Sequence, residues 1–213
     1  AGAVAAAVWA AQEPLDKRAF GVDYSDTNTQ EVGVDEPDTV ETDGRRLYTL
    51  TDDGRAECER LKRERLDYSV VNASISGDTS GGGRARLRPL LDKHRPAVVV
   101  LELGGNDGLR GIPVTHMKSS LTAIIRESQS AGARVLLVGV RLPPNYGEVY
   151  TSAFEAAYRE LATAHRIPLV PFILEDFAGN PEYFQADRLH PTEAAQPLML
   201  ERVWKGLQPL LTK

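Results

Sequence analysis

Ala97-Val-Val-Val-Leu-Glu-Leu-Gly-Gly-Asn-Asp107 is the stretch of sequence that decides the fold. Residues 97–103 are apolar except for Glu102, which is typical of a parallel strand covered on both faces. Two glycines end the run, and Asn106 and Asp107 follow them. In open sheets of parallel strands, ligands bind beyond the carboxyl ends of the strands. The stretch therefore predicts an α/β protein with polar site residues directly after this strand.

Segments with strand and helix patterns alternate on both sides of this stretch. Further strands are predicted at residues 68–71, 134–140 and 168–172. Helices are predicted at residues 56–66, 85–93, 117–125, 154–161 and 194–211, several of them with apolar residues at helical spacing. Because strand and helix alternate, the expected architecture is a three-layer α/β/α sandwich around a parallel sheet.

The composition excludes several classes of partner. The chain has 213 residues, 42% of them hydrophobic, and a formal net charge of −5 with basic and acidic residues intermixed. We therefore expect no nucleic-acid partner. Stable membrane insertion is not expected either, because no apolar run reaches the ~18 residues that a spanning helix needs. With the single cysteine Cys58 an internal disulfide is excluded, and no cluster of histidines and carboxylates has metal-ligand spacing, so we expect no metal and no cofactor.

The character of the chain changes near residue 55. Residues 20–46 are rich in Asp, Glu, Thr and Gly and poor in large apolar side chains, whereas the regular alternation begins at about residue 56. We divide the chain into an atypical N-terminal extension, 1–55, and an α/β domain, 56–213. The extension could supply or exchange an edge strand and so join two copies in a homodimer, because an uncovered sheet edge invites pairing.

Three short polar motifs lie in loops next to the predicted strands and helices. They are Asn72-Ala-Ser-Ile-Ser-Gly-Asp-Thr79, Gly104-Gly-Asn-Asp107 and Asp187-Arg-Leu-His-Pro191. With Arg141-Leu-Pro-Pro-Asn-Tyr-Gly147 they make residues 56–213 resemble the SGNH (GDSL) hydrolases, in particular the bacterial thioesterases, lysophospholipases and arylesterases. Residues 24–50 resemble instead the entry segment of secreted bacterial β-propellers.

The hydrolase resemblance implies a flavodoxin-like fold and a role for each motif. The N–H of Gly77 and the side chain of Asn106 would donate to an oxyanion, which pre-aimed neutral donors stabilise by ~3–4 kcal/mol each. His190 would be the general base, with Asp187 orienting its imidazole. The implied substrate is a short- or medium-chain acyl ester or thioester, and a periplasmic or secreted location is favoured over a cytoplasmic one. The walls of the acyl groove would come from Leu109, Leu142, Pro143 and Tyr146.

The nucleophile is the open part of this interpretation. The Gly-Asp-Ser-Leu block that carries the family's serine is absent, and the run Leu47-Tyr-Thr-Leu50 would take the place of the family's first strand. Ser76, Ser25, Asp53 and a water molecule activated by His190 remain alternatives. If none of them reaches the site, the chain would be a catalytically impaired acyl-binding protein.

Overall fold

The computed structural model of the chain describes residues 46–49, 60, 64, 66, 68–75, 77–186, 188 and 191–211. Within them a five-stranded sheet has the order β2-β1-β3-β4-β5, and every neighbouring pair of strands is parallel. The strands are β1 (Arg46–Thr49), β2 (Ser69–Asn72), β3 (Val98–Leu101), β4 (Arg134–Val138) and β5 (Leu169–Val170). The predicted α/β class and parallel sheet are confirmed, with the strand order of flavodoxin-like folds.

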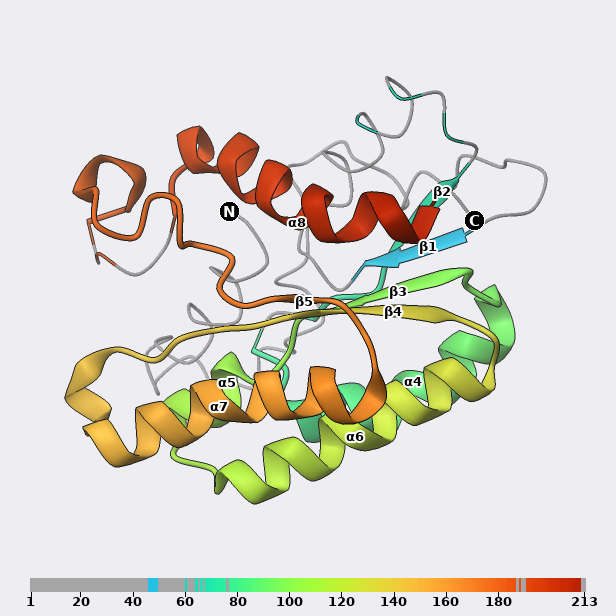
Figure 1. The fold of residues 1–213 in the computed structure, drawn as a ribbon, viewed down its shortest axis with the longest axis horizontal. Coiled ribbons are helices and arrows are strands. Elements are labelled where there is room, and N and C mark those ends of the chain that lie inside the picture. Colours follow the sequence, from blue (N-terminus) through green and yellow to red (C-terminus); the bar gives the residue numbers. More distant parts are fainter. Residues whose placement is uncertain are drawn as a thin grey trace, which may run out of the picture.

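Helices lie on both faces of this sheet, as Figure 1 shows. One face is covered by α4 (Ser80–His94), α6 (Val114–Ser130) and α7 (Glu148–His165), and the other by α8 (Gln196–Leu211). The short helix α5 (Gly105–Leu109) follows β3. Three single turns of 3₁₀ helix complete the described elements: η2 (Pro144–Tyr146), η3 (Pro181–Tyr183) and η4 (Glu193–Ala195). The predicted three-layer sandwich is therefore the observed arrangement.

The core forms where apolar stripes of the helices meet the sheet. All four residues of β3 are buried. On α6 the buried apolar residues are Met117, Leu121, Ile124 and Ile125, and on α7 they include Phe154 and Tyr158, as the helical spacing predicted. Because the middle strands are apolar on both faces, they can be packed between two helix layers.

Strand β1 is the described part of the N-terminal extension. It lies between β2 and β3, with Leu47 paired to Val70 on one side and to Val98 on the other. In the described sheet, β1 is therefore an interior strand and not an edge strand. The division of the chain at residue 55 and the exchange of a strand in a homodimer stay predictions, and the helix predicted at 56–66 falls mostly outside the described residues.

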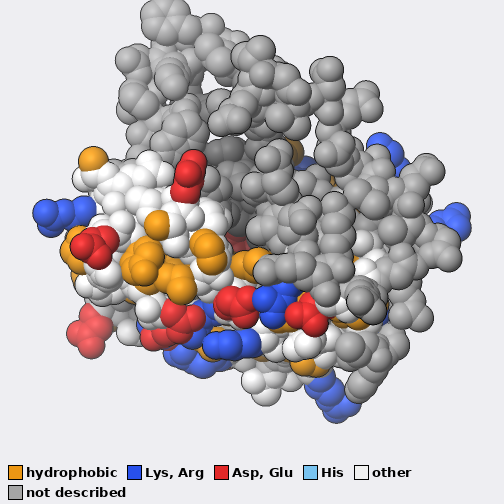
Figure 2. Space-filling model, turned by 90° about the horizontal axis from the view of Figure 1, so that it is seen from above, with side chains coloured by type: hydrophobic (Ala, Val, Ile, Leu, Met, Phe, Trp, Pro, Cys, Tyr) orange, Lys and Arg blue, Asp and Glu red, His pale blue; other side chains and the backbone are white. Residues whose placement is uncertain are grey.

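The described residues present a mixed surface. On the face seen in Figure 2, lysine and arginine side chains alternate with aspartate and glutamate and do not gather into one basic patch. In the described part of the chain, no helix combines the length and apolarity needed to span a bilayer.

Candidate active site

The predicted site residues divide into two groups. Gly77, Asn106 and the four predicted groove residues are described by the structure. Ser76, Asp187 and His190 lie outside the described residues, as do the alternative nucleophiles Ser25 and Asp53. The geometry that follows is therefore that of the oxyanion region and of the adjoining cavity.

The turn from β3 into α5 places Asn106. Gly104 has a φ of 115°, and a Cβ there would lie 2.3 Å from the Tyr158 hydroxyl and 2.8 Å from the Met117 sulfur. Only glycine fits such a backbone and such a gap. The Tyr158 hydroxyl also donates to the Leu103 carbonyl at 2.9 Å, which holds the end of the strand. The chain therefore turns sharply, and Asn106 lies in the first turn of α5 with its side chain fully buried.

The phenol of Tyr158 stays protonated in this position. Burial raises its pKa well above the ordinary value, and the nearby charges of Glu102 and Asp107 raise it further. A neutral hydroxyl is a donor, so the hydrogen bond to Leu103 persists across the working range of an enzyme.

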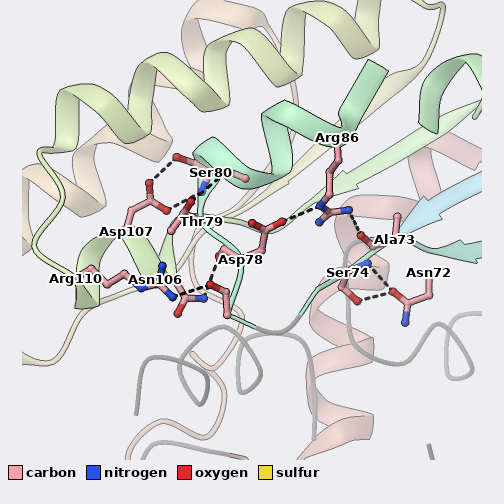
Figure 3. Close-up of polar contacts among 12 residues, drawn as sticks. Asn72, Ala73, Ser74, Asp78, Thr79, Ser80, Arg86, Asn106, Asp107 and Arg110 are labelled. Atoms are coloured by element: carbon pink, nitrogen blue, oxygen red, sulfur yellow. Dashed lines mark hydrogen bonds and ion pairs between the residues drawn. The ribbon is translucent and has the colours of Figure 1, made fainter. Parts of the chain in front are cut away.

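The loop from β2 to α4 carries Gly77 and is fixed by Arg86. The guanidinium of Arg86 donates from Nε to the Asp78 carboxylate at 2.8 Å and from Nη1 to the Ala73 carbonyl (Figure 3). One side chain of α4 thus contacts the loop on both sides of Gly77, which itself has a φ of 79°. The loop is closed into a turn at a glycine that tolerates this conformation.

Side chains in and just after α5 hold the same loop from the other side, as Figure 3 shows. Asn106 Nδ2 donates to the Asp78 carbonyl at 3.1 Å, and Arg110 Nη2 donates to the Gly77 carbonyl at 3.0 Å. The buried carboxylate of Asp107 accepts the Ser80 backbone N–H at 2.8 Å and the Ser80 hydroxyl at 2.6 Å. These hydrogen bonds fix residues 77–80 in register with α5, so that the loop cannot slide along the helix.

The amide of Asn106 keeps capacity for a ligand. A primary amide nitrogen has two N–H donors, and the bond to the Asp78 carbonyl uses one. Its Oδ1 atom is buried and has no hydrogen-bond partner in the part of the chain that the structure describes. A buried neutral donor held by fixed neighbours is the arrangement that stabilises a developing oxyanion without reorganisation.

A cavity of about 370 Å³ begins at Gly105, next to Asn106. Of the predicted groove residues, Leu109, Leu142 and Pro143 line it. Tyr146 is not in the lining, and its hydroxyl donates instead to the Leu109 carbonyl at 3.2 Å. The walls are mainly apolar, as is usual for sites that bind small organic molecules. The remaining lining residues are Val140, Arg141, Pro144, Phe172, Leu174, Ala178, Phe184 and Arg188.

The sequence analysis missed the walls that come from beyond β5. Phe172 and Leu174 follow that strand, so the rule that sites form at the carboxyl ends of parallel strands would have pointed to them. Phe184 forms an isolated antiparallel bridge with Pro191. That pairing is between residues of an irregular segment, and no local pattern in the sequence signals it.

Arg141 is a charged wall residue whose charge is already paired. Its guanidinium lies 3.4 Å from a Glu155 oxygen and 3.1 Å from a Glu175 oxygen, and its Cζ atom is 4.8 Å from the centre of the Phe172 ring. The pKa of Glu155 is lowered, first by its hydrogen bond from Arg159 and then by the charge of Arg141. Arg141 therefore has a structural role in joining α7 to the loop after β5.

No group of histidine, cysteine and carboxylate side chains among the described residues could hold a metal ion. The chemistry that the described residues can perform is therefore binding of an apolar chain beside a buried hydrogen-bond donor. That combination suits the carbonyl group of an acyl compound.

Comparison with known proteins points to the same chemistry of acyl compounds. Residues 28–197 match the profile of the GDSL-like Lipase/Acylhydrolase family. The chain is 52% identical over 153 residues to esterase TesA of Pseudomonas aeruginosa, a match that covers 72% of this chain and 76% of that protein. It is 48% identical over 143 residues to thioesterase 1/protease 1/lysophospholipase L1 of Escherichia coli, covering 67% and 69% of the two chains.

Solved structures agree with the sequence matches. The crystal structure of TesA superimposes with a TM-score of 0.72 at 44% identity, over 79% of this chain and 100% of that one. The β-propeller resemblance of residues 24–50 finds no support in these comparisons, and the family match begins inside that segment. The chain therefore belongs to the GDSL-like lipase/acylhydrolase family and is a carboxylic ester hydrolase.

Proposed function

We propose that the chain hydrolyses short- and medium-chain acyl esters and thioesters, with Gly77 and Asn106 as the oxyanion donors. The proposal is supported by the hydrogen bonds that hold residues 77–80 against α5, and by the apolar cavity lined by Gly105, the residue before Asn106. The ester carbonyl would lie against the two donors, and the acyl chain would enter the cavity past Leu109 and Leu142.

His190 and Asp187 complete the proposed machinery. His190 takes the proton of the attacking hydroxyl and returns it to the leaving alcohol or thiol, and Asp187 orients the imidazole. With Ser76 as nucleophile, its Oγ forms the acyl-enzyme bond as the bond to the leaving group breaks, and water then releases the acid. Ser25 or Asp53 could take this place, or a water molecule activated by His190 could attack the ester directly.

Hydrolysis of p-nitrophenyl butyrate by matched variants tests the proposal. His190→Ala should abolish activity, and His116→Ala, which removes an exposed histidine of α6, should not. Ser76→Ala should abolish activity if Ser76 is the nucleophile, with Ser152→Ala, an exposed position on α7, as its control.

Labelling by a fluorophosphonate separates the nucleophiles. A label on Ser76 or Ser25 identifies the attacking residue, and hydrolysis without any label supports Asp53 or activated water instead of a serine. Absence of both hydrolysis and labelling in the folded wild type would contradict the proposal and leave an acyl-binding protein.

A further inference from the structure

Helix α7 packs against α5, the short helix that carries Asn106, through two aromatic side chains. Tyr158 and Phe154 are each 1% exposed, and their rings pack edge to face with centres 5.5 Å apart. The Tyr158 hydroxyl occupies the place of a Cβ at Gly104, and the Phe154 ring lies 2.9 Å from the place of a Cβ at Gly108. The Gly108 N–H donates to the Gly104 carbonyl at 2.9 Å, so the two glycines bracket one turn of α5. Asn106 lies between them, and the two rings hold this turn at both ends.

The Tyr158 hydroxyl is the polar contact within this packing. It donates to the carbonyl of Leu103, the residue before Gly104, at 2.9 Å, and Leu103 is itself only 6% exposed. A buried carbonyl that loses its donor is costly, so the backbone would shift toward another partner. Such a shift would occur directly before Asn106, whose amide is bonded on its other side to the Asp78 carbonyl. The position of the Asn106 amide therefore depends on the Tyr158 hydroxyl.

We infer that Tyr158 is a positioning residue for ester hydrolysis and that it acts through Asn106. The inference rests on the proposed role of Asn106 as an oxyanion donor and assigns part of that role to a side chain of α7. Tyr158 is buried and is not part of the cavity lining, so it does not itself touch the substrate. An oxyanion donor must lie about 2.7–3.1 Å from the developing charge, so a small displacement of the amide weakens the transition state more than substrate binding.

A double-mutant cycle between Tyr158 and Asn106 tests the inference. The variants are Tyr158→Phe, Asn106→Ala and the protein with both changes, and the measured quantities are kcat and KM for p-nitrophenyl butyrate. Alone, Tyr158→Phe should lower kcat on the order of tenfold and change KM little. In the Asn106→Ala background it should change kcat by less than about twofold, because the group that Tyr158 positions is then absent.

Tyr68→Phe is the matched control. Tyr68 is also a buried tyrosine, and its hydroxyl donates to the Leu211 carbonyl at the same distance of 2.9 Å. That bond joins the residue before β2 to the end of α8 and is not part of the turn after β3. Tyr68→Phe should lower Tm about as much as Tyr158→Phe and leave kcat unchanged. Tyr158→para-aminophenylalanine keeps an N–H donor in place of the hydroxyl and should recover most of the kcat that Tyr158→Phe loses.

Two results would overturn the inference and leave the proposed function standing. One is a folded Tyr158→Phe protein whose kcat is within about twofold of wild type. The other is an equal loss of kcat in both backgrounds, since Tyr158 would then act independently of Asn106. A different result separates the two proposals: if wild type does not hydrolyse the ester, or Asn106→Ala keeps the wild-type kcat, the proposed function fails and the positioning role fails with it.

Discussion

Replacing Ser80 by alanine should destabilise the fold through a single hydrogen bond. Ser80 and Asp107 are 1% and 2% exposed, and the hydroxyl donates to the carboxylate at 2.6 Å. The variant keeps the backbone N–H bond to Asp107 but leaves one carboxylate oxygen buried without its donor. Hydrogen bonds to charged groups contribute about 1.5–3 kcal/mol, so we expect the free energy of unfolding to fall by about 2 kcal/mol.

Urea and thermal unfolding measure this change. For a chain of this size a loss of about 2 kcal/mol lowers Tm by about 4–8 °C. The control is Ser152→Ala on the exposed side of α7, which should change stability by less than about 0.5 kcal/mol. The same Ser80→Ala protein should also have a lower kcat toward p-nitrophenyl butyrate, because the register of residues 77–80 with α5 is loosened. A stability within about 0.5 kcal/mol of wild type would refute the reasoning.

Three further predictions concern the turn after β3, the cavity wall and the charge network. Gly104→Ala should destabilise by about 3 kcal/mol in urea unfolding, because its Cβ would clash with the Tyr158 hydroxyl in a backbone that disfavours alanine; an unchanged midpoint would contradict this. Gly108→Ala places a Cβ 2.4 Å from a methyl of Leu142, so this part of the cavity wall must shift. We therefore expect kcat/KM to fall more for an octanoyl ester than for an acetyl ester. Equal losses for the two esters would contradict this prediction. The pKa of Glu155 is lower in the folded protein than its ordinary value of 4.5, so its carboxylate stabilises the fold above pH 4.5, and this stabilisation is lost as the pH falls through the lower folded-state pKa. Glu155→Gln should therefore flatten the acid side of the curve of stability against pH. Identical curves for the variant and the wild type would disprove this.

The sheet and the helix stripes could be predicted because their signals are local. Residues 97–101 are all apolar, so a strand buried on both sides was the natural interpretation, and β3 is fully buried. The spacing of Met117, Leu121 and Ile124 places all of them on one face of α6, and all are buried. Periodicity is decided by neighbouring residues, which makes it readable from one sequence.

Other parts of the fold depend on features that local patterns misrepresent. Helix α4 begins at Ser80, earlier than the predicted Ala85, because the hydroxyl of Thr79 caps it by accepting the Gly82 N–H. Glycines 81–83 have low helix propensity and no apolar side chains, so nothing in the pattern indicated a helix there. Capping and tertiary packing outweighed propensity at this position.

The candidate site was predicted by its motifs but not by its contacts. Gly77 and Asn106 were named from short motifs, but the bonds from Asn106 to the Asp78 carbonyl and from Arg110 to the Gly77 carbonyl, which tie the loop to α5, were not predicted. The pairing of Ser80 with Asp107 and the position of Arg188 in the cavity wall depend on how distant segments meet. A single sequence does not reveal such contacts between segments that are far apart in the chain.

The most direct test of the account is kcat for p-nitrophenyl butyrate in Asn106→Ala compared with wild type, with folding of both proteins checked by thermal unfolding. If Asn106 stabilises the oxyanion, kcat should fall by about 10²–10³-fold, which is the usual effect of removing one such donor. The value of KM should change little, because the lost hydrogen bond is strongest in the transition state. A folded Asn106→Ala protein with the kcat of wild type would contradict the account.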